Sequence, residues 1–189
     1  MAVTPEMVGS FIKVFNSEAN LSGDLKYSIQ LMIPKTDKKG IAQLEALVAK
    51  AKTKGQEKKW GGKVPPFRYK PLRDGDEELE SGEKTDPCYK GMLFINASCN
   101  GNESDPRPQV VGPDAKPLMD QSLLYSGCIV RADLTAFPYK NGGNCGVGWW
   151  LNSIMLVRDG DRLDGKVNAA DAFANFAVDG ETEADDSLA

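Results

Sequence analysis

The chain alternates between short β-rich runs and stretches dense in Asn, Gly, Pro and Asp, and this pattern limits its fold more than any other feature. β-branched and aromatic residues gather in runs of strand length, and the glycines and prolines between them break regular structure. The five main runs are residues 8–15, 27–33, 89–99, 125–137 and 147–157, with a shorter run at 109–111. This inventory predicts a small antiparallel β-barrel of five main strands, with long loop insertions.

The first two runs have the pattern of a β-hairpin. Residues 16–24, which contain Asn, Ser and Gly, provide the loop between them. In the second run, side chains from Tyr27 to Ile33 alternate in polarity, with Ser28, Gln30 and Met32 at the intervening positions. We therefore expect one face of this strand to enter the core and the other to be mostly polar.

One segment has the spacing of an amphipathic helix. Pro34 ends the second strand, Asp37 can cap a helix, and apolar residues recur at helical intervals from Ile41 to Ala51, before Gly55. The barrel should therefore carry one main helix.

A basic, aromatic-rich segment follows this helix. Its glycines and prolines predict a loop, and cationic loops with exposed rings suit single-stranded nucleic acid, because bases stack on rings while Lys and Arg neutralise phosphates. The alternative is that the rings cover the barrel and the lysines only keep the loop soluble. The candidate DNA-binding residues here are Lys58, Lys59, Trp60, Lys63, Phe67, Arg68, Tyr69 and Lys70.

A second aromatic group flanks a Gly- and Asn-rich turn at residues 141–146. A hairpin there would bring Tyr139 and Lys140 close to Trp149 or Trp150. Because neighbouring strand residues face opposite sides, only one of the two tryptophans can enter the core. We predict that these four residues and Arg131 contact DNA, with an ion pair as the alternative role of Arg131.

Charge divides the chain. Residues 35–70 hold eleven Lys or Arg against three acids, whereas residues 167–189 hold six acids and no Lys or Arg. We therefore expect a nucleic-acid-binding domain at residues 1–166 and an acidic, flexible C-terminal tail at 167–189, with a short helix over 169–176. A tethered tail of this charge can compete with DNA for a basic surface or recruit replication and recombination proteins.

Catalysis and metal binding have little support in the sequence. The chain has no His, which removes His-dependent catalysis, and its four Cys form no CxxC pair, so we expect reduced thiols and no metal or cofactor. The main rival is a metal-dependent nuclease that uses the acidic stretch after residue 73. Its candidate ligands are Asp74, Asp76, Glu77, Asp159 and Asp161. An exposed acidic turn is the simpler interpretation of the stretch, and a β-rich phage structural protein is a third class.

Several motifs in the second half resemble a known family. They are Arg107-Pro108-Gln109-Val110-Val111, Tyr125-Ser126-Gly127-Cys128 leading into Val130-Arg131-Ala132, Phe137-Pro138-Tyr139, Gly142-Gly143-Asn144-Cys145-Gly146-Val147, Leu151-Asn152-Ser153-Ile154 and Val157-Arg158-Asp159-Gly160-Asp161-Arg162-Leu163. In order and spacing the chain resembles the tailed-phage single-stranded DNA-binding proteins with an OB fold, formerly a domain of unknown function. The resemblance implies a non-catalytic protein that coats single-stranded DNA in phage replication or recombination, with little sequence preference.

We also expect a protein of the host-cell cytoplasm without membrane contact, because no segment approaches the roughly 20 apolar residues of a membrane span. Double-stranded DNA and RNA stay open as further partners, because phosphate contacts distinguish them poorly.

Overall fold

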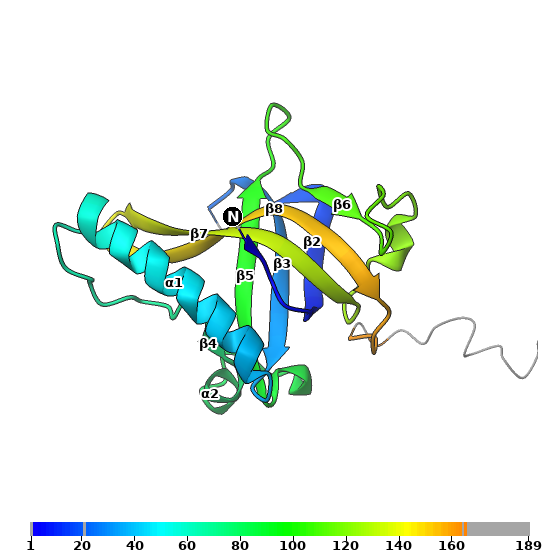
Figure 1. Ribbon diagram of the computed structural model, residues 1–189, viewed down its shortest axis with the longest axis horizontal. Helices are drawn as coiled ribbons and strands as arrows, with labels where there is room; N and C mark the ends of the chain where they lie inside the picture. The colour runs from blue at the N-terminus through cyan, green and yellow to red at the C-terminus, as the bar shows by residue number, and fades with distance from the viewer. Residues whose placement is uncertain (1, 21, 164, 166–189) are drawn as a thin grey trace, which may run out of the picture.

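The computed structural model describes residues 2–20, 22–163 and 165, and its core is a barrel of five long strands (Figure 1). These strands are β2 (Met7–Ala19), β3 (Leu25–Pro34), β5 (Met92–Asn100), β7 (Ile129–Asn141) and β8 (Asn144–Arg158). They pair in the closed order β2-β3-β5-β8-β7-β2. This mainly β architecture confirms the predicted OB-fold barrel.

The pairing is antiparallel except along the edge of β8 that faces away from β7. There β5 runs parallel to β8, and so does the short strand β6 (Gln109–Val111). Two further short strands, β1 (Ala2–Val3) and β4 (Arg73–Asp74), pair with β7 and β5. The predicted hairpin of β2 and β3 is confirmed, although β2 continues to Ala19 and so shortens the loop.

The core fills the barrel with the inward residues of all five long strands. In β3 the alternation predicted from sequence holds, since Tyr27, Ile29, Leu31 and Ile33 are all buried in the main cluster. The opposite face of β3 is less open than predicted, because a second cluster covers Met32 there. This cover comes from the segment between β4 and β5, which contains helix α2 (Gly75–Glu80) and the 3-10 turn η1 (Pro87–Tyr89).

Helix α1 (Lys38–Lys58) packs against β7 under the β7–β8 hairpin (Figure 1). Asp37 caps it as predicted, accepting a hydrogen bond from the Gly40 N–H at 2.9 Å. Gly55 does not end the helix. It is a buried position inside α1, where a Cβ would come within 2.4 Å of the Trp60 ring, so glycine serves close packing at this site.

The strand boundaries also shift from prediction at two places. Tyr89 belongs to η1 rather than to β5, and residues 125–128 precede β7 instead of forming its start, after the 3-10 turn η2 (Gln121–Leu123). Neither α2 nor the two 3-10 turns were predicted.

The segment that follows β8 is held to the barrel by Tyr125. The Tyr125 hydroxyl donates to the Gly160 carbonyl at 3.0 Å, and the Leu163 N–H donates to the Ser126 carbonyl at 2.9 Å. These two hydrogen bonds hold the chain against the barrel as far as Leu163. The predicted tail at 167–189 and its short helix lie outside the described residues. Within the described ranges, none of the helices has the length and apolarity needed to span a membrane.

Candidate nucleic-acid interface

The candidate interface is the outer face, which we define as the solvent side of β2, β3, β5 and the part of β8 beside β5. Its middle is a polar row, because outward residues of β3 and β5 stand opposite each other as Lys26↔Asn100, Ser28↔Ser98 and Gln30↔Asn96. Trp150 on β8 is the register partner of Ser98 and so extends this face.

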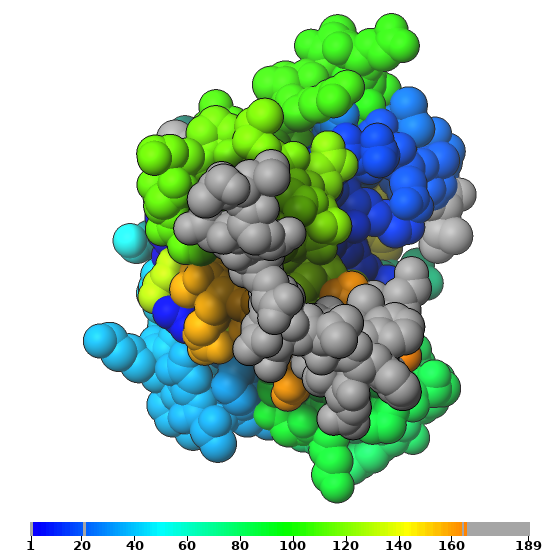
Figure 2. Space-filling model, turned by 90° about the vertical axis from the view of Figure 1, so that its right-hand side faces the viewer, coloured from blue at the N-terminus to red at the C-terminus, as the bar shows by residue number. Residues whose placement is uncertain are grey.

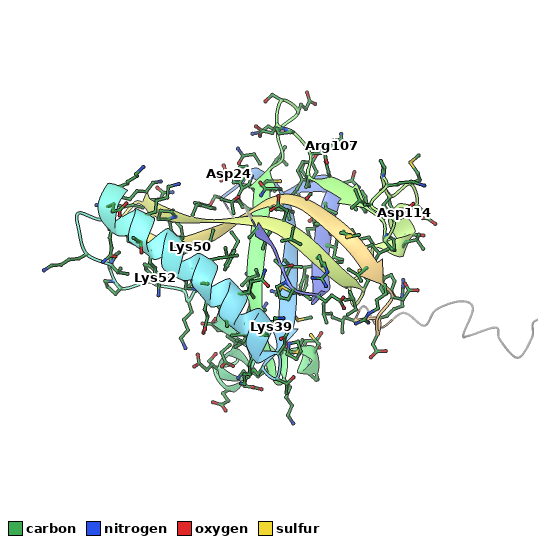
Figure 3. The ribbon with its side chains drawn as sticks, viewed as in Figure 1. Asp24, Lys39, Lys50, Lys52, Arg107 and Asp114 are labelled. Carbon is green, nitrogen blue, oxygen red and sulfur yellow. The ribbon has the colours of Figure 1, made fainter. Side chains whose placement is uncertain are left out.

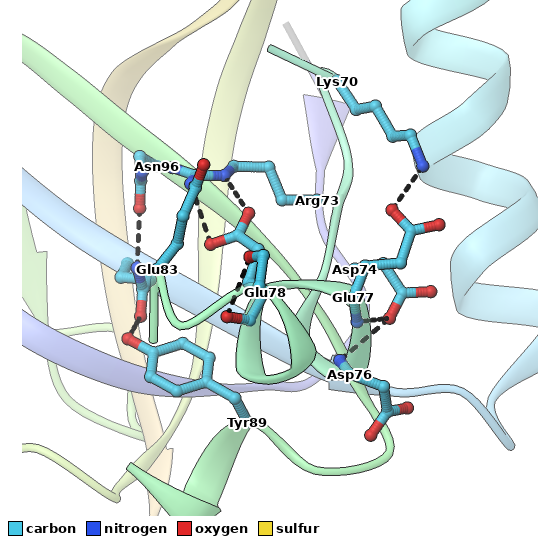
Figure 4. A network of polar contacts seen from close by, with 11 residues as sticks. Lys70, Arg73, Asp74, Asp76, Glu77, Glu78, Glu83, Tyr89 and Asn96 are labelled. Atoms are coloured by element: carbon cyan, nitrogen blue, oxygen red, sulfur yellow. Dashed lines mark hydrogen bonds and ion pairs between the residues drawn. The ribbon is translucent and has the colours of Figure 1, made fainter. Parts of the chain in front are cut away.

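A hydrogen-bond chain fixes the lower part of the row (Figure 4). The Tyr89 hydroxyl donates to Gln30 Oε1, and Gln30 Nε2 donates to Asn96 Oδ1 at 2.9 Å. Burial raises the pKa of Tyr89 to about 12, so its hydroxyl stays protonated and acts as the donor. Asn96 is exposed at the end of this chain and presents a positioned amide to solvent.

A β-bulge in β2 presents Phe11 on the same face. Between the register pairs Ser10↔Gln30 and Lys13↔Ser28, β2 has two residues where β3 has one, and Phe11 in this bulge has a φ of +46°. Its side chain is 59% exposed. The Lys84 ammonium lies 5.7 Å from the Phe11 ring centre and 4.8 Å from the Tyr89 ring centre. An exposed ring beside a cation is the pairing that a base and its phosphate require.

The β7–β8 hairpin carries an aromatic strip, which consists of Trp150, Phe137 and Tyr139. Register places Phe137 opposite Gly148 and Tyr139 opposite Gly146, so each ring lies over a glycine of the facing strand. Phe137 and Trp150 meet edge to face, with ring centres 6.5 Å apart. Trp150 is 38% exposed. The strip therefore continues the outer face along the hairpin.

The other two tryptophans are buried, which argues against the predicted stacking roles of Trp60 and Trp149. Trp149 is 4% exposed and Trp60 is 9% exposed. Their indole N–H groups donate to the backbone carbonyls of Pro71 and Tyr139 at 2.8 and 3.1 Å. Phe67 packs edge to face on Trp60 and is half-buried. These three rings seal the side of the hairpin that faces α1. The expectation that only one of Trp149 and Trp150 enters the core is confirmed.

The predicted cations fall into separate groups. Lys58, Lys59, Lys63 and Lys140 are all exposed, and the bond from Trp60 to Tyr139 brings the loop that follows α1 to the hairpin. Lys70 forms an ion pair with Glu77.

Arg68 and Tyr69 lie close to Arg73 of β4. The Arg68 and Arg73 guanidinium groups lie 5.3 and 5.5 Å from the Tyr69 ring centre, and Tyr69 is 50% exposed. Arg73 also lies 5.0 Å from the ring centre of Phe94 on β5, so Tyr69 adjoins the lower outer face.

Arg131 forms the ion pair that was the alternative to a DNA contact. Its guanidinium lies 3.2 Å from the Glu6 carboxylate and donates to the Thr4 carbonyl at 3.3 Å. These contacts tie β7 to the segment that follows β1. Glu6 also lies 3.2 Å from the Arg158 guanidinium, so the two arginines share one carboxylate.

The acidic stretch after residue 73 serves the fold. Asp74 caps α2, because its carboxylate accepts hydrogen bonds from the Asp76 and Glu77 N–H groups (Figure 4). Asp74 and Asp76 also bind the same Lys35 ammonium, at 2.6 and 2.7 Å. Hydrogen bonds from Lys35 and from the Gly91 N–H hold the pKa of Asp76 below its ordinary value. Glu78 pairs with Arg73. Among the described residues no group of three or more His, Cys, Asp or Glu could hold a metal ion. Residues 75–80 of the stretch therefore form a helix whose carboxylates pair with neighbouring cations such as Lys35 and Arg73.

All four cysteines are free. Cys99 and Cys128 are buried, while Cys88 and Cys145 are half-buried, as expected for reduced thiols. Burial raises the pKa of Cys88 to about 12 and that of Cys128 to about 11, so both are protonated and unreactive at neutral pH.

The sequence did not predict the polar row as part of the interface, nor did it predict Phe137, Phe11 and Lys84 on the outer face. Phe137 has a visible signal, because it lies two residues from Tyr139 and so shares its face. Phe11, Lys84 and Asn96 in the polar row depend on a bulge and on long-range packing.

Comparisons with known proteins find similarity to single-stranded DNA-binding proteins of phages. Residues 2–187 match the family model described as Enterobacter phage Enc34, ssDNA-binding protein. The solved single-stranded DNA-binding protein of bacteriophage Enc34 is 22% identical with a TM-score of 0.66, covering 90% of this chain and 88% of that one. Its complex with ssDNA is 21% identical with a TM-score of 0.68, covering 85% and 88%.

A second phage protein has a similar fold. The structure of gp2.5, a single-stranded DNA-binding protein encoded by bacteriophage T7, is 16% identical with a TM-score of 0.60, covering 100% of this chain and 97% of that one. A search of curated protein sequences finds no significant match.

Proposed function

We propose that this chain, which belongs to the family of the ssDNA-binding protein of Enterobacter phage Enc34, coats single-stranded DNA in phage replication or recombination. The observation that carries the proposal is the outer face, where exposed aromatic rings flank a polar row and cations lie at its edges. Binding is stoichiometric, and the protein carries out no catalysis on the strand.

The strand crosses the barrel from Phe11 to the hairpin. Bases stack on Phe11, on Trp150 and on the neighbouring rings of the aromatic strip, at about 1 to 3 kcal/mol each. Amides and hydroxyls of the polar row contact the strand between these rings. Phosphates meet exposed or half-exposed cations at the rim of this path. These are Lys26, Lys84, Arg68 and, at the hairpin end, Lys58, Lys59, Lys63 and Lys140.

Ring exposure favours single strands over duplex DNA. Bases in a duplex are stacked on each other and cannot reach Phe11 or Trp150, whereas phosphates are available in both forms. Duplex DNA should therefore bind through the cations alone, more weakly and with a steep dependence on salt.

The acidic C-terminal residues regulate this surface in our proposal. Six carboxylates without a compensating cation, tethered to the domain, reach an effective concentration in the millimolar range and compete with phosphates for the lysines. When DNA displaces them, they become free to bind replication or recombination proteins.

A tryptophan-fluorescence titration tests the proposal. Oligo-dT and a duplex of equal length are added to the full chain at several salt concentrations, with and without Mg²⁺. We expect quenching by the single strand, and log K should fall against log salt with a slope of about −0.7 for each phosphate contact. Cleavage of the oligonucleotide in Mg²⁺ would favour a nuclease. Absence of affinity at low salt, together with large assemblies, would favour a structural protein.

A further inference from the structure

The wall of the barrel opens at β8, beside Trp150. β5 pairs with β8 only at Ala97↔Trp149 and Ser98↔Trp150, and β6 joins the same edge from Gln109↔Ser153 onward. The two residues between, Leu151 and Asn152, have no register partner in β5 or β6. Residues 101–108 link these strands in a loop that projects from the molecule (Figures 1 and 2).

A cavity of about 250 Å³ lies in this opening. Trp150 lines it together with Asp105 and Arg107 from the loop and the amides of Asn100 and Asn152. Pockets that hold drug-sized ligands are larger, about 300 to 1,000 Å³, so this cavity suits one flat ring system rather than several nucleotides. Since Trp150 belongs to the aromatic strip, a strand on the outer face passes the mouth of the cavity.

Two charged groups in the cavity have unused hydrogen-bonding capacity. Asp105 is half-buried, and its Oδ2 accepts a bond from Asn102 Nδ2 at 2.9 Å, while its Oδ1 accepts none from any described residue. Arg107 is exposed and forms no ion pair or hydrogen bond within the described part of the chain (Figure 3). A carboxylate offers acceptors alone, and a guanidinium offers a rigid fork of donors.

We propose that this cavity receives one guanine base of the bound strand, so that the protein prefers single strands with guanine at one position. The inference rests on the proposed single-stranded DNA binding. Guanine presents two adjacent donors, N1–H and the N2 amino group, to the Asp105 carboxylate. Its O6 and N7 acceptors suit the Arg107 fork, and its face stacks on Trp150.

The other three bases lack this match. Adenine and cytosine present a ring-nitrogen acceptor next to their amino group, which opposes a carboxylate. Thymine presents one N–H between two carbonyls. Because Asp105 is half-buried and Arg107 is exposed, water can replace part of these contacts when another base is bound, so the expected discrimination is modest. The preference therefore follows from the pairing of an acceptor and a donor fork across one small cavity.

Competition binding to the full chain tests this inference. A fluorescent oligo-dT is displaced by unlabelled oligo-dT in which one central nucleotide is dT, dA, dC or dG. We expect the dG oligonucleotide to bind about fivefold more tightly or better. Deoxyinosine, which lacks the N2 amino group, and 7-deazaguanine, which lacks N7, should each lose part of the gain.

Two variants assign each contact to its atom. In Asp105→Asn, dG and deoxyinosine should bind equally, and in Arg107→Gln, dG and 7-deazaguanine should bind equally. Asp114 and Lys116 form an ion pair with each other at 3.5 Å and lie outside the cavity. The control variants Asp114→Asn and Lys116→Gln should therefore keep the full preference for guanine. Because each readout is a ratio of affinities within one variant, a general loss of binding does not obscure it.

The outcomes separate the two proposals. Equal affinity for all four oligonucleotides, with oligo-dT binding intact, would overturn the guanine site and leave the proposed function standing. A guanine preference that survives both cavity variants would also overturn the assignment to this cavity. Failure to bind any single strand would instead overturn the proposed function itself.

Discussion

The ring of Phe137 packs on the α-carbon of Gly148, its register partner on the facing strand, so closely that a Cβ at position 148 would lie 2.8 Å from the ring. An aromatic ring over a strand glycine restores packing that glycine itself cannot supply. The contact also holds Phe137 edge to face with Trp150. The two glycines of the hairpin therefore position the aromatic strip.

Replacing Gly148 with Ala should displace Phe137 and weaken binding of oligo-dT about tenfold, the value of one lost base stack. Fluorescence anisotropy with labelled oligo-dT measures this. Gly112→Ala is the control, because its Cβ would meet no atom closer than 3.3 Å. Unchanged affinity of Gly148→Ala would mean that DNA does not use the hairpin.

Trp150→Phe should abolish most of the DNA-induced quenching while affinity falls less than tenfold, because phenylalanine still stacks. Most of the quenching should come from Trp150, because Trp60 and Trp149 are buried and a base cannot stack on them. The quenching titration of the variant measures this directly. Quenching of normal amplitude without Trp150 would show that a buried tryptophan reports on DNA.

Two arginines should differ in their salt dependence. Arg68 is exposed and close to the Tyr69 ring, so Arg68→Gln should reduce the slope of log K against log salt by about 0.7. Arg131 shares the Glu6 carboxylate with Arg158 and is also held by the Thr4 carbonyl, so Arg131→Gln should change the slope less than Arg68→Gln. Titrations at four or more salt concentrations give both slopes, and equal slopes for the two variants would refute the proposed path of the backbone.

Trp60→Ala should lower the free energy of unfolding by about 3 to 5 kcal/mol. The substitution removes the packing on Gly55 and the bond to the Tyr139 carbonyl, which hold the loop that follows α1 to the hairpin. Urea denaturation measures the loss. Trp150→Ala, at an exposed position, is the control and should cost far less.

Removal of the residues after Lys166 should tighten binding of oligo-dT, because the six carboxylates no longer compete with phosphate. Replacing these carboxylates by amides in the full chain should have the same effect. This variant shows whether the negative charge of the tail matters rather than its length. The difference should shrink at high salt, where both interactions are screened. Affinity that stays equal or falls on truncation would contradict competition by the tail.

The fold was predictable because its signals are local. The period-two alternation of β3 and the Asp37 cap of α1 are each visible within ten residues of sequence. Helix α2 was not predictable, because its six residues carry no apolar period and are held by ion pairs such as that between Glu78 and Arg73. Gly55 resembled a helix stop, and only the position of Trp60 explains it as a packing site.

The candidate site was predictable in part for the same reason. Alternation alone places one of Trp149 and Trp150 on a surface, and the structure shows that it is Trp150. The burial of Trp60 depends on a partner 79 residues away, which local sequence does not contain. The pairing of Arg131 with Glu6 spans 125 residues and was equally hidden.

The bulge at Phe11 sets stability and binding against each other. A non-glycine residue with positive φ costs of order 1 to 3 kcal/mol, which glycine would avoid. Glycine, however, would remove a ring that is exposed on the outer face. Libraries of this chain selected only for thermal resistance should therefore drift to glycine at position 11, whereas libraries selected for function should retain an aromatic residue. Comparing the residues found at position 11 in the two selected libraries would show whether the protein keeps a less stable backbone conformation there in order to bind DNA.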